Sequence, residues 1–514
     1  MKDLDPKDVE TCLRVLQAVV DDRSLLAQVD ELRRRELLMA AGVVSRPARP
    51  QLKRLAKTLR RQKRAETRKH DAQVVATAAN RAARRSSAFL LPASTVEPAA
   101  SEAAEAAGGP ETELKNDRNC YICKEPYRRV HHFYDSMCPA CAELNYKKRL
   151  QTARLDGRVA LLTGARIKIG YQAALMLLRA GARVIATTRF PNDAALRYAK
   201  EPDYEAWRDR LELHGIDLRH VPSVELFARH LSETAGRLDI LINNAAQTVR
   251  RPPAFYEHLV AAEEQALSAM PSAVQPLLQA NAELRQKVAG VRTALAESGP
   301  GLMRFSGAGA GLGLLEPARL SQVPCAPDDT RYGAAMFPAG QVDADAQQVD
   351  LRPMNSWRLR LEDVPTPELL EVHLVNAVAP FVLNSKLKPL MMRERTDEKH
   401  IVNVSAMEAQ FARNKKTDKH PHTNMAKAAL NMMTRTSAQD YANHGIFMNS
   451  VDTGWVTDED PVHHSLRKVV EHDFHPPLDS IDGAARVIDP IFTGLLTGHH
   501  VWGHFLKDYQ PVRW

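Results

Sequence analysis

Four of the six cysteines in this sequence are spaced as metal ligands are. Cys120 and Cys123 form one C-x2-C pair, and Cys138 and Cys141 form a second pair after fourteen intervening residues. Each C-x2-C turn presents two thiolates to one ion, and zinc prefers four ligands in a tetrahedron. A redox role would need only one such pair. The spacing therefore predicts a structural zinc site that leaves no open position for catalysis.

The other cysteines and nearby histidines have simpler interpretations. Six cysteines in a chain of 514 residues do not make a disulfide framework. Cys12 and Cys325 are isolated, and we expect small buried or incidental thiols there. His131 and His132 lie between the two cysteine pairs, and we expect them at the surface or beside the ligands rather than as ligands.

A glycine-containing turn joins two apolar segments at the end of the first third of the chain. VALL (159–162) reads as a buried strand, TGARIKIG (163–170) opens an amphipathic helix, and RVIATT (183–188) reads as a second strand. The first N–H groups of such a helix have no partners within it and suit a pyrophosphate. The pattern predicts a dinucleotide-binding turn.

The segments that follow continue the alternation of strand and helix. They are, in order, HGIDLRH (214–220), which ends a third strand with Asp217, LDILINNAA (238–246), HLVNAVAPF (373–381) with Asn376, HIVNVSAM (400–407), HTNMAKAAL (422–430) with Lys427, and GIFMNSVDTGWVTDEDP (445–461). In this order the motifs resemble the short-chain dehydrogenase/reductase family over residues 156–250 and 360–514. The resemblance implies an α/β fold, a doubly wound parallel Rossmann sheet with helices on both faces.

The resemblance also implies where a dinucleotide would bind. The implied contacts are Thr163, Gly164, Arg166, Lys168, Ile169 and Gly170 in the turn, Asp217 and Leu218 at the adenine, Asn244 and Ala245 under the ribose, Lys427 at the nicotinamide ribose, and Thr457 at the nicotinamide amide. In NAD-binding members an acidic residue ends the second strand and holds the ribose 2′-hydroxyl. Here Thr188 and Arg189 stand at that place. An arginine grips a 2′-phosphate that a carboxylate would repel, so we expect NADP(H).

Lys168 replaces the middle glycine of the family's turn. A basic residue at this place resembles the pteridine reductases, which bind NADPH with an arginine there. The substitution therefore reinforces the expectation of NADP(H) and hints only weakly at the substrate. A turn that no longer binds a dinucleotide is the alternative interpretation.

The residues expected to carry the chemistry depart from the family. Asn376 and Lys427 are in place, but Thr423 occupies the position of the tyrosine that protonates the carbonyl oxygen. Ala406 stands where a serine is expected, with Ser405 one residue earlier. Threonine is a far weaker acid than a phenol, so we expect non-standard acid catalysis.

Three sources of the proton remain open. His422 or His420, beside the start of the helix, is the first, because histidine titrates near the operating pH. A substrate with an imine-like ring could instead take its proton from solvent. Tyr256, between the two halves of the fold, is the third. A polar surface loop explains the two histidines equally well.

The sequence before the cysteines is helical and basic in pattern. Between Arg46 and Ser87 there are fourteen Lys or Arg residues against Glu66 and Asp71, a local charge of +12 (14 − 2), so the rest of the chain carries about −4 (8 − 12). Phosphate attraction by this arm is possible. A solvated helix is the alternative, because no aromatic residues are interleaved with the basic ones to stack on bases.

These features divide the chain into consecutive segments. They are a helical and basic extension (1–87), a linker of small residues, Pro and Gly (88–115), a four-cysteine zinc-binding module (116–150), and the Rossmann domain (156–514) with an insertion over 248–365. The insertion has a helical pattern from Phe255 to Glu297. Its run GAGAGLG (307–313) does not match a phosphate-binding motif and is interpreted as a loop.

Together these features predict an NADP(H)-dependent oxidoreductase acting on a small carbonyl or imine-like substrate. The alternative is an inactive NADP-binding sensor or scaffold that contacts protein or nucleic acid through the zinc module and residues 46–87. No apolar run approaches the length of a membrane span, and the N-terminus MKDLDPKDVE resembles no targeting peptide. We therefore expect a cytoplasmic protein, with a homo-oligomer as the family's common state.

Overall fold

The structure is a computed structural model. It describes residues 5–85, 113–297, 311–338, 340–343, 347–413 and 416–514. The chain divides into two compact units, Met1–Ala72 and Gln73–Trp514, which are considered separately. Most of the expected linker (88–115) and of the glycine run (307–313) falls outside the described residues. Within those residues, the helices are too short or too polar to cross a bilayer.

The first unit consists of helices. They are α1 (Pro6–Asp21), the 3-10 helix η1 (Arg23–Gln28), α2 (Glu31–Ser45) and most of α3 (Arg49–Ala76). Asp5 begins α1 by accepting a hydrogen bond from the backbone N–H of Lys7 at 2.9 Å. Asp30 does the same for α2 with Arg33 at 3.0 Å. In the described residues of α1, η1 and α2 no side chain is buried.

The second unit contains an eight-stranded, mostly parallel sheet in the order β10-β9-β8-β7-β6-β3-β4-β5. Its strands are β3 (Val159–Thr163), β4 (Arg183–Thr188), β5 (Leu211–Gly215), β6 (Ile240–Asn243), β7 (Lys399–Ser405), β8 (Ile446–Asp452), β9 (Phe505–Lys507) and β10 (Gln510–Val512). Only β10 is antiparallel to its neighbour among these strands. The chain order reverses between β3 and β6, as in a doubly wound fold, so the predicted fold class is confirmed.

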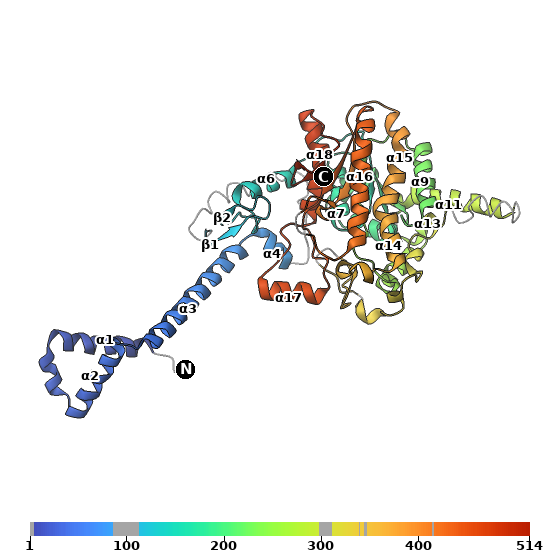
Figure 1. Cartoon of the computed structure of the whole chain (residues 1–514). Coiled ribbons are helices and arrows are strands. Elements are labelled where there is room, and N and C mark those ends of the chain that lie inside the picture. The colour runs from blue at the N-terminus through green and yellow to red at the C-terminus, as the bar shows by residue number, and fades with distance from the viewer. Residues whose placement is uncertain (1–4, 86–112, 298–310, 339, 344–346, 414–415) are drawn as a thin grey trace. The chain divides into compact units, whose positions relative to one another are not determined.

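Helices cover both faces of this sheet. On one face lie α7 (Lys168–Arg179) and α18 (Ser480–Thr497); on the other lie α9 (Val221–Thr234), α15 (Ala379–Met392) and α16 (Pro421–Ala442), which Figure 1 shows side by side. Alternate residues of β3 pack into the two cores: Ala160 and Leu162 face α7 and α18, and Leu161 faces α9 and α15. A strand buried on both faces explains the unbroken apolar run VALL.

The insertion packs beside the carboxyl edge of the sheet and has a small core of its own. It begins with η5 (Pro253–Phe255), α10 (Glu257–Glu263) and α11 (Gln275–Glu297). The helical stretch expected from Phe255 to Glu297 is therefore divided between Glu263 and Gln275, and Pro271 within this gap lacks the N–H that a continuous helix would require. The core gathers the aromatic residues Phe190, Phe255, Tyr256 and Phe337 with Leu259 and Ala318.

The cysteines lie in a small module that comes between the N-terminal helices and the sheet along the chain. Its elements are β1 (Glu113–Asn119), β2 (Pro126–Arg129) and α6 (Pro139–Leu150). The end of α3 and the short helix α4 (Ala79–Arg85) pack on it. Val74 and Val75 share its apolar cluster with Tyr134 and Met137, and Arg81 of α4 binds Asp135. All of these residues belong to the second unit.

Candidate functional site

The turn between β3 and α7 requires glycine at two positions. Gly164 has a φ of +71°, and a Cβ there would lie 2.8 Å from the Cα of Ala245. A Cβ on Gly170 would lie 2.1 Å from the carbonyl oxygen of Gly164. Thr163 is buried below the turn, where its Oγ1 accepts the backbone N–H groups of Asn244 and Ala245 at 3.1 Å each. The turn is thus tied to the end of β6.

Lys168 keeps the backbone conformation of the glycine that it replaces. Its φ is +55°, in the left-handed region that favours glycine, and it is the first residue of α7. The preceding residue, Ile167, provides no side-chain cap for this helix. The N-terminus of α7 therefore offers backbone N–H groups to an anion. The Nζ atom of Lys168 lies 3.8 Å from Oε1 of Glu459.

A cavity of about 350 Å³ lies at the carboxyl ends of the strands, where the chain order reverses. Among the residues implied for cofactor binding, its wall includes Gly164, Arg166, Lys168, Ile169, Gly170, Thr188, Arg189, Asp217, Leu218, Asn244, Ala245 and Thr457. Two further residues of that set lie elsewhere. Thr163 is beneath the turn, and Lys427 lies outside the wall.

The wall of this cavity carries an excess of positive charge. Its basic members are Arg166, Lys168, Arg189, Arg219 and Arg251, and its carboxylates are Asp217 and Glu459, which gives a formal charge of +3 (5 − 2). Three of these arginines are paired: Arg166 with Asp193 at 2.8 Å, Arg219 with Asp217 at 2.7 Å, and Arg251 with Asp350. Arg189 donates to a phenol and has no carboxylate partner among the described residues, so its charge is available to an anionic ligand.

Arg189, at the end of β4, is held by an aromatic residue of the insertion. Its Nη2 donates a 2.8 Å hydrogen bond to the hydroxyl of Tyr256, and its guanidinium lies 4.6 Å from the centre of that ring. The ring of Phe190 lies 5.5 Å from the guanidinium. Burial raises the pKa of Tyr256, but the charges of Arg189, Arg251 and Arg219 outweigh it and hold that pKa below its usual value.

This position argues against Tyr256 as a proton donor beside Lys427. Lys427 contacts β7, which is three strands away from β4 in the sheet. Strands are ~4.8 Å apart, so the two sites are separated by roughly 14 Å. Tyr256 lies beside Arg189, at the end of the cavity next to β4.

Asn376 lies in an unusual turn of helix at the other end of the site. A π-helical segment (Leu374–Val378) joins α14 (Thr366–His373) to α15. Within it the Oδ1 of Asn376 accepts the backbone N–H of Gln247 at 2.7 Å, and its Nδ2 donates to the carbonyl of Gln247 at 3.2 Å. The side chain thereby fixes the segment that follows β6, which also lines the cavity.

Lys427, Thr423 and Ser405 form a buried polar group next to this turn. Lys427 Nζ donates to the carbonyl oxygen of Val404 at 2.6 Å, and burial lowers the pKa of Lys427 to about 8. Thr423 lies one helical turn earlier on α16. Neither the hydroxyl of Thr423 nor that of Ser405 has a hydrogen-bond partner in the described part of the chain. This group lies beyond the wall of the cavity.

The two histidines at the start of α16 are buried, not on a surface loop. His422 Nε2 lies 3.2 Å from Glu368 Oε1 on α14, and its Nδ1 has no partner among the described residues. His420 stacks on Trp357, with ring centres 3.8 Å apart, and its backbone N–H donates to Leu359 in the insertion. Burial lowers the pKa of His420. The surface-loop interpretation was therefore wrong for both.

Two segments of the chain match known families. Residues 158–281 match the short chain dehydrogenase family, and residues 353–470 match the family described as enoyl-(acyl carrier protein) reductase. The chain belongs to the short-chain dehydrogenase/reductase family.

Individual relatives differ in how much of this chain they match. The uncharacterized protein R665 of Acanthamoeba polyphaga mimivirus is 31% identical over 389 residues, 73% of this chain and 71% of that protein. Retinol dehydrogenase 13 of Mus musculus is 35% identical over 94 residues, 18% of this chain and 28% of that enzyme. The NADP active-site complex of RhlG from Pseudomonas aeruginosa is 18% identical over 69% of this chain and 95% of that one, with a TM-score of 0.41.

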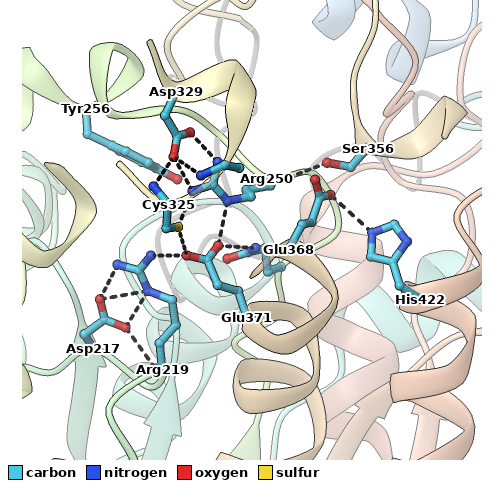
Figure 2. A network of polar contacts seen from close by, with 12 residues as sticks. Asp217, Arg219, Arg250, Tyr256, Cys325, Asp329, Ser356, Glu368, Glu371 and His422 are labelled. Carbon is cyan, nitrogen blue, oxygen red and sulfur yellow. Dashed lines mark hydrogen bonds and ion pairs between the residues drawn. The ribbon is translucent and has the colours of Figure 1, made fainter. Parts of the chain in front are cut away.

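In this short-chain dehydrogenase/reductase, a network of ion pairs fastens the insertion to α14 (Figure 2). Arg250 binds Glu371 of α14 at 2.8 Å and both carboxylate oxygens of Asp329. Glu371 also accepts from Arg219 at 2.7 Å and from the side chain of Gln247 at 3.2 Å. Burial raises the pKa of Glu371, and Arg219 and Arg250 more than offset that and lower it. The carboxylate of Glu371 therefore binds two residues of the cavity wall, Arg219 and Gln247.

Several of these residues were absent from the sequence interpretation. Arg219 and Arg251 line the cavity, Glu368 contacts His422, and Glu371 binds Arg219 and Arg250. Arg219 follows Asp217 by two residues, which is a signal of a local pair. Glu368 and Glu371 are three residues apart and lie on one face of α14. The sequence shows this spacing but does not show which residues the two glutamates bind.

The four cysteines of the module converge. Their sulfur atoms all lie within 4.8 Å of one another, and Cys123 and Cys138 are 3.7 Å apart. A tetrahedral ion with ~2.3 Å bonds to sulfur places its ligands roughly 3.8 Å apart, so the cluster fits a single ion. Cys138 is the N-cap of α6, and Cys141 lies in the first turn of that helix.

Proposed function

We propose that this chain is an NADP(H)-dependent oxidoreductase that reduces or oxidises a small carbonyl or imine-like substrate with non-standard acid catalysis. The observation that carries the proposal is the positively charged cavity at the carboxyl edge of the sheet, with Arg189 held in place at the end of β4. Family membership supplies the reaction class, and the residues of this chain supply the cofactor preference.

Arg189 and Tyr256 together suit a 2′-phosphate. The position before Arg189 is Thr188, so no carboxylate stands at the end of β4 to repel the phosphate. Because the phenol oxygen of Tyr256 accepts from Arg189, its own proton is free to be donated to a phosphate oxygen. Hydrogen bonds to charged groups are worth ~1.5–3 kcal/mol each, enough to set a preference between the two dinucleotides.

The N-terminus of α7 and Lys168 suit the pyrophosphate. The helix start supplies N–H groups and the positive end of its dipole. Lys168 lies at that start with its ammonium directed towards Glu459 on the opposite wall. A 3.8 Å ion pair with a carboxylate is loose enough to exchange for a phosphate oxygen.

When bound, NADPH supplies a hydride to the carbonyl carbon of the substrate and becomes NADP+. A proton must then reach the carbonyl oxygen. Lys427 is the acid we favour, because its lowered pKa of about 8 makes its ammonium a much better donor than an ordinary lysine. The free hydroxyls of Thr423 and Ser405 lie in the same buried group and can relay this proton.

His422 is the second candidate for the proton. Its Nε2 is engaged by Glu368, which leaves Nδ1 to act. A carboxylate that binds one nitrogen of a histidine fixes the orientation of the ring. The pH dependence of variants at Lys427 and His422 separates the two candidates.

Binding and turnover test the proposal. Calorimetry of the full chain should show NADPH binding more tightly than NADH. NADPH oxidation is then followed against a panel of aldehydes, ketones and pterins. Heat with neither dinucleotide would refute the proposal. Tight NADPH binding without turnover on that panel and on a metabolite extract would favour a dinucleotide sensor instead.

We also propose that the four cysteines hold a structural zinc ion. Convergence of Cys120, Cys123, Cys138 and Cys141 on one point supports this, because four sulfur ligands complete a tetrahedron. Metal analysis of the purified protein should find one zinc per chain. A protein that contains no zinc and takes up none when zinc is added would refute it.

A further inference from the structure

The cysteine module holds the loop that follows β8. The backbone N–H of Trp455 donates to the hydroxyl of Tyr121 at 2.9 Å, and Tyr121 lies inside the first C-x2-C turn. On the other side, the carbonyl of Trp455 accepts from the N–H of Leu478 at 3.3 Å. A Cβ on Gly454 would lie 2.5 Å from Leu478 and 3.3 Å from the Tyr121 hydroxyl, so the loop has no spare room here.

The same loop forms part of the cavity wall. Thr457 and Glu459 line the cavity, two and four residues beyond Trp455. Thr457 Oγ1 donates to Glu459 Oε1 at 2.7 Å, and Glu459 in turn faces Lys168 of the dinucleotide turn. A shift of the backbone at Trp455 would therefore move two residues of the wall.

An apolar contact joins the module directly to the dinucleotide turn. Val456 and Leu478 belong to the hydrophobic cluster of the module, and Ile169 packs against that cluster. Ile169 also lines the cavity. A Cβ on Gly483 would lie 2.8 Å from Ile169 and 3.1 Å from Val456, which shows how closely these surfaces meet.

Ion pairs also attach the module to the chain between the end of α17 and the start of α18. Arg149 of α6 binds Asp479 at 2.6 Å and Asp482 at 3.0 Å, at the start of α18. Arg81 of α4 binds Asp135 of the module at 2.6 Å and Asp473, the exposed residue that follows α17 (Val462–His472), at 2.7 Å. The segment that follows the loop is therefore held by the module before and at the start of α18.

We propose that the cysteine module, once it holds a metal ion, positions the loop from Gly454 to Glu459 and so couples ion binding to dinucleotide binding, with Tyr121 as the positioning residue. This inference rests on the proposed function. It assigns the module a role in cofactor affinity beyond its own stability.

A bound ion would fix the turn from Cys120 to Cys123, which carries Tyr121. Without the ion, a module of this size has only a small apolar core, to which the end of α3 and the loop residues Val456 and Leu478 contribute. The turn also holds Lys124 at a φ of +66°, a conformation that costs a non-glycine residue energy and that an ion bound by Cys120 and Cys123 would maintain. Coupling between two binding sites is reciprocal. A bound dinucleotide must therefore raise the affinity of the module for its ion by the same factor by which the ion raises the affinity for the dinucleotide.

The test compares two tyrosines of the module. Tyr121→Phe removes the hydrogen bond to the loop. Tyr127→Phe removes a similar bond, 2.7 Å to the carbonyl of Asp135, that stays within the module. Zinc-loaded full-length protein is titrated with NADPH by calorimetry, and zinc release to a chromogenic chelator is timed with and without NADPH. Zinc content is measured for every variant.

Tyr121→Phe should weaken NADPH binding about three- to tenfold, the worth of one neutral hydrogen bond, at unchanged zinc content. Tyr127→Phe should bind NADPH as the parent protein does. NADPH should slow zinc release from the parent and from Tyr127→Phe, and much less from Tyr121→Phe. Removal of zinc should weaken NADPH binding at least as much as Tyr121→Phe does.

Several results would overturn the inference. Equal NADPH affinity in Tyr121→Phe and the parent would do so, as would zinc release that NADPH does not change. Equal losses in both tyrosine variants would overturn it too, because they indicate a general loss of module stability. If zinc-loaded parent protein binds neither dinucleotide, the proposed function fails as well, and the two failures are therefore distinguishable.

Discussion

The two ends of the cofactor site are built differently. Around Arg189 the side chains line an accessible cavity, and their charges are set for an anion. Around Lys427 they are buried, bonded to backbone or without a partner among the described residues, and outside the cavity wall. The first end offers the charge of Arg189 to an anion, whereas at the second end Thr423 stands where the resemblance to the family leads us to expect a tyrosine.

Under the proposed function, binding and chemistry depend on separate parts of the fold. Arg189 is fixed by Tyr256 of the insertion, whereas Lys427 depends on α16 and on the carbonyl of Val404 in β7. Changes at one end should therefore leave the other end intact. Variants that separate affinity from rate test this division.

The largest effect is expected from Lys427→Met, which replaces the buried ammonium with an apolar side chain of similar length. If Lys427 donates the proton, kcat for carbonyl reduction should fall about 100-fold or more, with NADPH affinity changed far less. Steady-state kinetics and calorimetry measure the two. Lys399→Met is the matched control, because Lys399 is buried at the opposite end of β7. Unchanged kcat in Lys427→Met would contradict the assignment.

A slightly smaller effect is expected at the other end. Arg189→Glu removes the proposed phosphate ligand and adds a repelling charge, so NADPH should bind about 100-fold more weakly, while NADH binding stays within a few-fold. The control is Arg183→Glu, at the exposed start of the same strand. Equal losses for both dinucleotides would show that Arg189 supports the fold rather than recognises the phosphate.

The pH dependence of reduction sharpens the choice of proton donor. Burial lowers the pKa of Lys427 to about 8, so its ammonium is lost as pH rises through that value. The reduction rate should be constant below this pH and fall roughly tenfold per unit above it. In Lys427→Arg the charge persists and the decline should disappear. A decline that persists in Lys427→Arg and vanishes in His422→Gln would assign the proton to His422.

The smallest effect is expected from Tyr256→Phe. The ring still packs on Phe190, but the hydrogen bond to Arg189 is lost. NADPH should bind about three- to tenfold more weakly, the worth of a single hydrogen bond, with NADH unaffected. Calorimetry with both dinucleotides measures the ratio. A ratio equal to that of the parent protein would mean that Arg189 holds its position without the phenol.

The sheet was predictable where strands are long and buried. β3, β4 and β6 to β8 are apolar runs that end on polar residues, and such runs are visible in the sequence. β9 and β10, of three residues each, carry no such pattern and were not predicted. The turn between β3 and α7 was predictable too, because Gly164 and Gly170 follow a buried strand and precede an amphipathic helix.

The contacts made by the insertion were not predictable. Arg250 pairs with Asp329 and Glu371, which are 79 and 121 residues away along the chain. Periodicity reports which face of a helix is apolar, and it is silent about partners at such separations. The burial of His422 was missed for the same reason, since Glu368 lies on a distant helix.

The insertion contributes Arg251, Tyr256 and Gln347 to the wall of the cavity, and its last segment stacks Trp357 on His420. A molecule in the cavity therefore contacts the sheet edge on one side and the insertion on the other, so a change of sequence in the insertion can alter which ligand the cavity accepts.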